Sequence, residues 1–211
     1  MKNKIIFELK LNSKDSIIAY EKNDYDSCYE DSMLYINIDG EKTKIAEHSF
    51  CYIFGADMYY RIYNVKDFSE DSNFAVSLKD YYNTIVYNDE YNPDDPSSFY
   101  IHSFEGTDPS DYDFAYGNST NNLGLYLFKN KNEYTLMLIK LWQDKSTKKH
   151  ETKTISEYRI SKDTFAEWKA LISTEWEKRT VIEGEKIPKA KGSKEDWQKH
   201  FEFMRSDKKR N

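Results

Sequence analysis

The chain has 211 residues, of which 38% are hydrophobic, 16% aromatic and 32% charged, and its formal net charge is −6. This length fits one domain of ordinary size, and the aromatic content argues against an intrinsically disordered chain. The two cysteines, Cys28 and Cys51, lack CxxC and zinc-finger spacing, so the sequence indicates neither a zinc site nor a disulfide framework.

The hydropathy pattern gives no sign of a membrane segment. No apolar run approaches the roughly 18–20 residues of a membrane-spanning helix. The first eight residues also lack the apolar core of about 7–15 residues that a signal peptide needs. We therefore expect a cytoplasmic protein that does not associate with membranes.

The first two-thirds of the chain alternates apolar and polar residues with period two, which is typical of strands. Asp39-Gly40 is a tight-turn pair between two such segments. Residues 77–87 fit either a helix, with Ser77 and Asp80 as a capping box, or a strand. The predicted strands are residues 5–11, 17–20, 34–38, 42–47, 50–54, 59–65, 98–104, 123–128, 134–142 and 152–160.

The last third of the chain changes to a helical period. Ser161 is the predicted N-cap of a helix that ends near Arg179. Ser193 with Asp196 predicts the start of a second, shorter helix. Each helix has an apolar stripe at steps of three or four residues. The stripes consist of Phe165, Trp168, Ile172 and Trp176, and of Trp197, Phe201 and Met204.

Strands that precede helices predict an α+β fold. We expect a mainly antiparallel β-sheet of about 8–9 strands, followed by two C-terminal amphipathic helices packed on it. A single α+β domain should span residues 1–184, with a β-rich part over 1–160 and a helix over 161–180. Residues 185–211 should form a linker and a C-terminal helix with a frayed basic end.

Charge is unevenly distributed along the chain. Residues 1–144 carry a net charge of −12 and residues 145–211 a net charge of +6. Between Asp67 and Phe128 there are fourteen Phe and Tyr residues, and Lys79 is the single base. The twelve acids of this stretch are Asp67, Glu70, Asp71, Asp80, Asp89, Glu90, Asp94, Asp95, Glu105, Asp108, Asp111 and Asp113.

A concentrated negative surface with many tyrosines attracts a basic partner and repels nucleic acid, so direct nucleic-acid binding is disfavoured. We expect a protein-binding module that neutralises a basic protein, such as a toxin or nuclease. Bacterial or phage immunity proteins, antitoxins and anti-defence inhibitors act in this way. The predicted partner-binding residues are Tyr82, Tyr87, Asp89, Glu90, Tyr91, Asp94, Asp95, Asp108, Asp111, Tyr112 and Asp113.

Two other classes stay open. A small-ligand-binding protein or an enzyme would have a pocket lined by Tyr, Trp and His102, whereas a structural or phage assembly protein would use flat sheet edges. The acids of residues 108–113 provide the oxygen ligands that calcium prefers, but their spacing does not fit an EF-hand. Because no nucleophile, phosphate-loop or zinc motif is present, we expect no catalytic residue, cofactor or metal.

Overall fold

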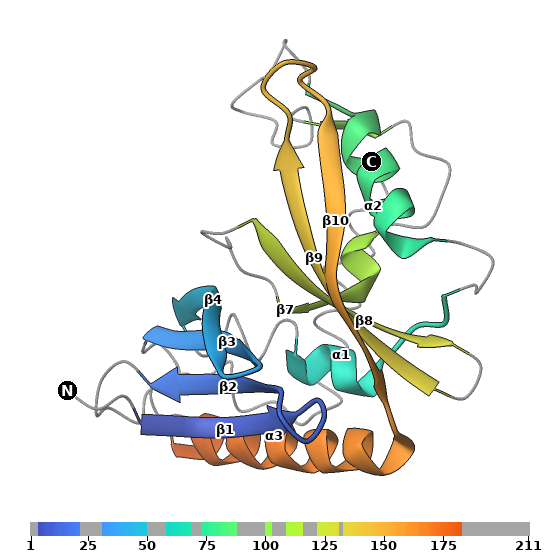
Figure 1. The fold of residues 1–211 in the computed structure, drawn as a ribbon. Helices are drawn as coiled ribbons and strands as arrows, with labels where there is room; N and C mark the ends of the chain where they lie inside the picture. The colour runs from blue at the N-terminus through green and yellow to red at the C-terminus, as the bar shows by residue number, and fades with distance from the viewer. Residues whose placement is uncertain are drawn as a thin grey trace.

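The computed structural model describes residues 4–21, 31–49, 58–68, 73–87, 100–102, 109–115, 122–130 and 133–182. Predictions that fall elsewhere, including the strand at 50–54, the helix that begins at Ser193 and the linker, lie outside the described residues. Two antiparallel four-stranded sheets dominate the described chain (Figure 1).

The first sheet, sheet A, is an antiparallel meander in the order β1-β2-β3-β4. Asp39 and Gly40 form the turn between β3 and β4 with φ angles of 50° and 88°, as their tight-turn chemistry predicts. The strands of sheet A are β1 (Lys4–Lys10), β2 (Ser16–Glu21), β3 (Asp31–Ile38) and β4 (Glu41–Ser49).

The second sheet, sheet B, is also a meander, in the order β10-β9-β8-β7. Its strands are β7 (Asp113–Ala115), β8 (Leu123–Asn130), β9 (Glu133–Gln143) and β10 (His150–Ile160). A short ladder pairs β5 (Ile85–Tyr87) with β6 (Tyr100–His102). The eight strands of sheets A and B agree with the predicted count, but they form two sheets instead of one.

The helices do not follow the predicted order of strands first and helices last. Helices α1 (Tyr60–Tyr63), α2 (Phe74–Thr84) and η3 (Pro109–Tyr112) all precede sheet B's last three strands. Among the described helices, α3 (Lys162–Ile182) alone follows the strands. The coarse α+β class therefore holds, whereas the arrangement of a single sheet with helices only after the strands does not, and the predicted second terminal helix lies outside the described residues.

The strand predicted over residues 59–65 is wrong, because this segment contains α1. In helical geometry Tyr59, Ile62 and Tyr63 lie on one side, at i, i+3 and i+4. The rings of Tyr59 and Tyr63 are 5.1 Å apart, and Tyr59 stacks on Trp176 of α3 at 5.4 Å. Packing against α3 thus overrides the β propensity of these residues.

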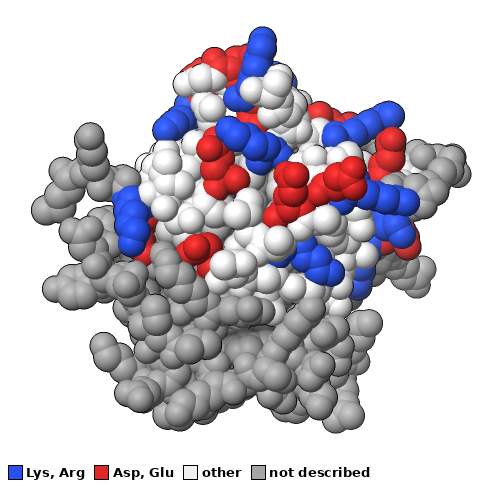
Figure 2. Space-filling model, turned by 90° about the horizontal axis from the view of Figure 1, so that it is seen from below, with Lys and Arg blue, Asp and Glu red and all other residues white. Residues whose placement is uncertain are grey.

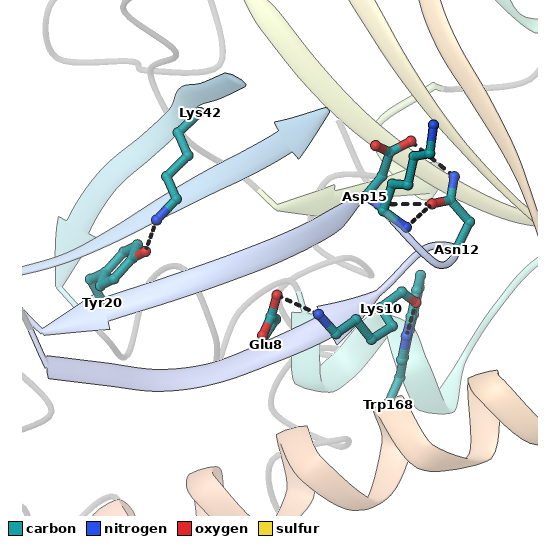
Figure 3. Close-up of polar contacts among 8 residues, drawn as sticks. Glu8, Lys10, Asn12, Asp15, Tyr20, Lys42 and Trp168 are labelled. Carbon is teal, nitrogen blue, oxygen red and sulfur yellow. Dashed lines mark hydrogen bonds and ion pairs between the residues drawn. The ribbon is translucent and has the colours of Figure 1, made fainter. Parts of the chain in front are cut away.

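Helix α3 begins as the sequence predicts. The backbone N–H of Thr164 donates to the Ser161 hydroxyl oxygen at 3.1 Å, which is an N-cap hydrogen bond. The predicted stripe of Phe165, Trp168, Ile172 and Trp176 is buried. The Trp168 indole N–H donates to the carbonyl of Lys10 at 2.9 Å, so this helix covers part of the free edge of β1 (Figure 3).

Sheet B has a core on each of its faces. Alternate residues such as Leu125 and Leu127 face the large core, which also contains the inner face of sheet A, α1 and the stripe of α3. Tyr126 and Phe128, at the positions between, face a second cluster that includes residues of α2. Sheet B therefore forms a middle layer, with sheet A and α3 on one side and α2 on the other.

A buried carboxylate joins the two sheets. Asp15 lies in the turn between β1 and β2 and is only 8% exposed. Its carboxylate accepts hydrogen bonds from the Asp39 N–H at 2.8 Å, the Asn12 amide at 2.9 Å and the Tyr158 hydroxyl of β10 at 3.2 Å. The first two donors hold the pKa of Asp15 below its ordinary value. Figure 3 shows Asp15 with Asn12 at this turn.

Candidate functional site

The predicted partner-binding residues that the structure describes include Tyr82 of α2 and Tyr112 of η3, which lie on the outer face of sheet B. A cluster of rings attaches these two elements to the sheet. We call this cluster the aromatic core. The Phe74 ring lies 5.2 Å from Phe128 and 5.3 Å from Tyr112, so α2, β8 and η3 meet at one point. The members of the aromatic core are Phe68, Phe74, Ala75, Leu78, Tyr112, Tyr126, Phe128, Met137 and Ile139.

Local signals explain why α2 starts where it does. The side-chain oxygen of Asn73 accepts from the Val76 N–H at 3.3 Å, and the Asn73 carbonyl accepts from Ser77 at 3.0 Å. Asn73 is therefore the N-cap, four residues before the predicted capping box at Ser77. The two alternatives for residues 77–87 are both partly right, since α2 ends at Thr84 and β5 follows it directly.

Helix α2 is also fixed along β10 by polar contacts. The Asn83 side chain bonds the backbone of His150 twice, accepting from its N–H at 2.7 Å and donating to its carbonyl at 3.0 Å. The Thr152 hydroxyl donates to the carbonyl of Ala75 at 2.8 Å. Both ends of α2 are thus attached to the same strand. Sequence reasoning missed Asn83 because its partner lies 67 residues away.

Two predicted site residues, Tyr82 and Tyr87, lie on this anchored helix and on the strand that follows it. Tyr82 is half-buried on α2, with its ring 5.6 Å from that of His150. Tyr87 pairs with Tyr100 in the β5–β6 ladder. The two residues that flank segment 88–99 are therefore neighbours in this ladder, which directly follows α2 in the chain. The other predicted contact residues of this segment and Asp108 lie outside the described residues. Those of the segment are Asp89, Glu90, Tyr91, Asp94 and Asp95.

The last three predicted site residues lie at η3 and β7. Asp111 pairs with Lys66 at 2.5 Å, and Asp113 is half-buried in β7. Tyr112 is only 4% exposed and donates its hydroxyl to the carbonyl of Asp67 at 3.2 Å. Burial and the neighbouring Asp111 raise the pKa of this phenol. Its ring therefore stabilises the aromatic core and offers little contact area to a partner.

Two of the four acids of the central stretch that the structure describes form ion pairs with lysines. Asp67 lies 4.0 Å from Lys129, and Asp111 has the pair with Lys66 described above. Asp80 is exposed on α2. The face of α3 and β1 has a similar balance, because lysines and acids alternate over its described part (Figure 2). A coherent anionic surface therefore depends on the acids of segments 69–72, 88–99 and 103–108, which lie outside the described residues.

Metal and ligand chemistry finds little support in the described part of the chain. No group of three or more His, Cys, Asp or Glu residues there is placed to hold a metal ion. The carboxylate of Asp111, one of the acids considered as a calcium ligand, pairs with Lys66. His102 lies in β6 opposite Ile85, and its ring is outside the described residues.

Comparison with known proteins gives no family for this chain: it matches no protein-family model, no curated protein and no solved structure. Within the described ranges, none of the helices is long and apolar enough to cross a membrane.

Proposed function

We propose that the protein is a binding module whose outer layer on sheet B presents an acidic, tyrosine-rich segment to a basic protein partner. The observation that carries this proposal is the pairing of Tyr87 with Tyr100. This pair attaches both ends of segment 88–99, with Asp89, Glu90, Asp94 and Asp95, to a layer that the aromatic core and Asn83 hold on sheet B.

An anchored layer suits such a role, because a contact surface on a rigid support loses less conformational entropy when it binds. Carboxylates steer a basic protein toward the site and favour the correct orientation. Tyrosines such as Tyr82, Tyr87 and Tyr91 add large contact area with few rotatable bonds. A partner that acts on nucleic acid, such as a nuclease or toxin, has the required basic surface, which places the module among inhibitors of the immunity or antitoxin type.

The sheet edges favour this proposal over a role in assembly. A flat, uncharged edge strand recruits another strand, whereas charges, bulges and covering elements prevent this pairing. Helix α3 covers part of the β1 edge, and β10 carries exposed Lys153, Glu157 and Arg159 beside a register shift between Thr154 and Ser156.

The experiment neutralises the acids of segment 88–99 and measures partner capture. The tagged protein is purified from its native cell, and co-purified proteins are identified by mass spectrometry. The identified partner is then titrated at low and moderate salt against a variant with Asp89→Asn, Glu90→Gln, Asp94→Asn and Asp95→Asn. We expect at least about a tenfold loss of affinity, about 1.4 kcal/mol, and a weaker salt dependence than in the unmodified protein.

The matched control neutralises four exposed acids outside the layer: Glu41→Gln, Glu157→Gln, Asp163→Asn and Glu167→Gln. It has the same change in net charge, so a loss of affinity in the first variant alone identifies the segment. Equal affinity of the first variant and the unmodified protein, or an equal loss in the control, contradicts the proposal.

A further inference from the structure

The hairpin of β9 and β10 extends past the rest of sheet B. Strand β8 pairs with β9 only as far as Lys140, while β10 continues to pair with β9 up to Gln143. The end of this hairpin rises at the top of the view in Figure 1. We call residues 140–153 the lysine ribbon, because they carry five lysines and two acids, a net charge of +3: Lys140, Lys145, Lys148, Lys149 and Lys153, with Asp144 and Glu151.

The tip of the lysine ribbon is a defined turn. The Asp144 carboxylate accepts from the backbone N–H groups of Ser146 at 2.8 Å and Thr147 at 2.9 Å. The Ser146 hydroxyl and these backbone donors lower the pKa of Asp144 to about 2. The carbonyl of Asp144 accepts from Lys148, which adopts the left-handed conformation with a φ of 60°. The three lysines of the tip are therefore displayed from an ordered backbone.

The two faces of the ribbon differ. One face lies against α2, because Ile139 belongs to the aromatic core and Thr152 bonds the carbonyl of Ala75. Side chains alternate along a strand, so Lys140 and Lys153 lie on the other face, where they are directly opposite in the ladder. Trp142 is half-exposed on this same face. The lysine face thus points away from α2.

The lysines of the ribbon differ from six other lysines of the described chain in their ion pairing. All five are exposed, and none forms an ion pair with a described acid. Six lysines elsewhere do pair with carboxylates: Lys4, Lys10, Lys14, Lys44, Lys66 and Lys129. Lys140 and Lys153, as like charges directly opposite in a ladder, repel each other. A bound polyanion removes this repulsion.

We propose that the lysine ribbon docks in a groove of duplex DNA and binds its phosphates. A two-stranded ribbon fits the major groove, which is about 12 Å wide. Phosphates line both walls of that groove, which matches cations placed at the tip and on the free face of a projecting hairpin. An acidic protein surface, by contrast, contacts such a hairpin from one side and does not surround the lysines of both the tip and the free face. This proposal is independent of the function proposed above, since it uses the tip of the hairpin and the face opposite α2 and does not involve segment 88–99.

The net charge of −6 disfavours nucleic-acid binding when the chain is treated as a whole. The fold changes this interpretation, because Lys140 and Lys153 lie on the face of the hairpin opposite α2. Counterion release then favours binding at low salt and weakens it steeply as salt rises. Sequence reasoning missed the site because it considered charge by chain segment, and the ribbon spans the boundary at residue 144 between the acidic and basic parts.

The test measures fluorescence anisotropy of a labelled duplex of about 20 base pairs, roughly two helical turns, over a series of salt concentrations. We expect saturable binding at low salt. Replacing Lys145, Lys148 and Lys149 with Gln should weaken binding and reduce the slope of log K against log salt by about 0.9 for each lost phosphate contact. A second variant, Lys140→Gln with Lys153→Gln, removes the lysines of the free face and should also weaken binding and reduce the salt slope.

The control replaces three exposed lysines outside the ribbon, Lys10, Lys14 and Lys162, with Gln, and should keep most of the affinity and slope. No anisotropy change at low salt overturns the proposal, as does an equal loss in the control. Competition by a poly-glutamate peptide as effective as unlabelled duplex overturns it in favour of an acidic protein. Acetylation footprinting of the unmodified protein gives a readout without variants: DNA should protect the ribbon lysines, and unchanged acetylation contradicts the site.

Discussion

The two faces of sheet B hold cores of different kinds. The large core combines aliphatic side chains from two sheets with the tryptophans of α3, and a buried carboxylate, Asp15, closes its edge. Five of the nine members of the aromatic core on the other face are rings, and they come from β8 and from outer elements such as α2, with Phe74, and η3, with Tyr112. One core therefore determines how the two sheets are joined, and the other determines where α2 and η3 are held.

This difference suggests a division of labour between the faces. Elements that carry a contact surface can vary without loss of the fold when they pack on a separate cluster. The predictions below test whether the large core contributes most to global stability, the aromatic core contributes less, and the tip of the ribbon affects only local structure.

The largest effect is expected from Trp168→Ala. Trp168 is 1% exposed, stacks on Phe114 with a centroid distance of 6.0 Å and donates to β1. Its truncation should lower the free energy of unfolding by about 3–5 kcal/mol, as measured by urea titration. Leu171→Ala on the same helix, where the side chain is 43% exposed, should cost about 0.5 kcal/mol. Similar losses for the two variants would show that the stripe does not anchor the large core.

The next effect concerns the joint between the sheets. Asp15→Asn should lower the free energy of unfolding by about 1–3 kcal/mol near neutral pH, because a charged acceptor of three hydrogen bonds is lost. The pKa of Asp15 is lowered from 3.8 in the folded protein, so its contribution is present above that pH and is lost as the pH falls further. The difference between the two proteins should therefore shrink below pH 3.8. A pH-independent difference, or an equal one for the exposed Asp80→Asn, contradicts this role.

The aromatic core can be tested at Gly124, over which the Tyr126 ring lies. A Cβ atom at Gly124 would lie 2.6 Å from the Tyr126 hydroxyl oxygen and 2.7 Å from Cε2, so Gly124→Ala must displace the ring. We expect a loss of about 1–3 kcal/mol in the free energy of unfolding. Combining it with Tyr126→Leu should give less than the sum of the single losses. If the two losses in the free energy of unfolding are additive, the contact between residue 124 and the Tyr126 ring is not the source of the destabilisation.

The smallest effect is expected at the tip of the lysine ribbon. Asp144→Ala removes the acceptor that organises the turn, but the turn is exposed and far from both cores. The urea midpoint should not change, whereas amide exchange at Ser146 and Thr147 should become faster, as measured by NMR. In the unmodified protein the same exchange should rise as the pH falls from 3.8 toward the lowered pKa of about 2, after correction for intrinsic rates. Unchanged exchange in the variant contradicts the proposed turn.

Parts of this organisation could be predicted from local sequence. The strands β8 to β10, the Asp39-Gly40 turn, the Ser161 cap and the stripe of α3 could all be predicted from residues a few positions apart. The two-sided burial of sheet B also had a signal that was missed. Residues 125–128 and 136–139 form apolar runs without polar alternation, which is typical of strands buried on both faces.

Other parts depend on residues far apart in the chain. Asp15 meets Tyr158 across 143 positions, and Asn83 meets His150 across 67. No local pattern indicates such partners. The same applies to α1, where contacts with α3 decide between helix and strand for residues that favour strands. Among the predicted site residues, Tyr112 shows why composition is insufficient to identify a contact surface. Its position in an acidic loop suggested an exposed residue, whereas its ring is buried against Phe74 of α2.

Hydrogen–deuterium exchange of the full chain with and without its captured basic partner tests the central claim most directly. If the layer on the outer face of sheet B carries the contact surface, peptides covering residues 74–102 and 109–115 should be protected by the partner. Peptides of sheet A and α3 should exchange as they do in the free protein. Protection confined to sheet A or α3, with residues 74–115 unchanged, would contradict the account.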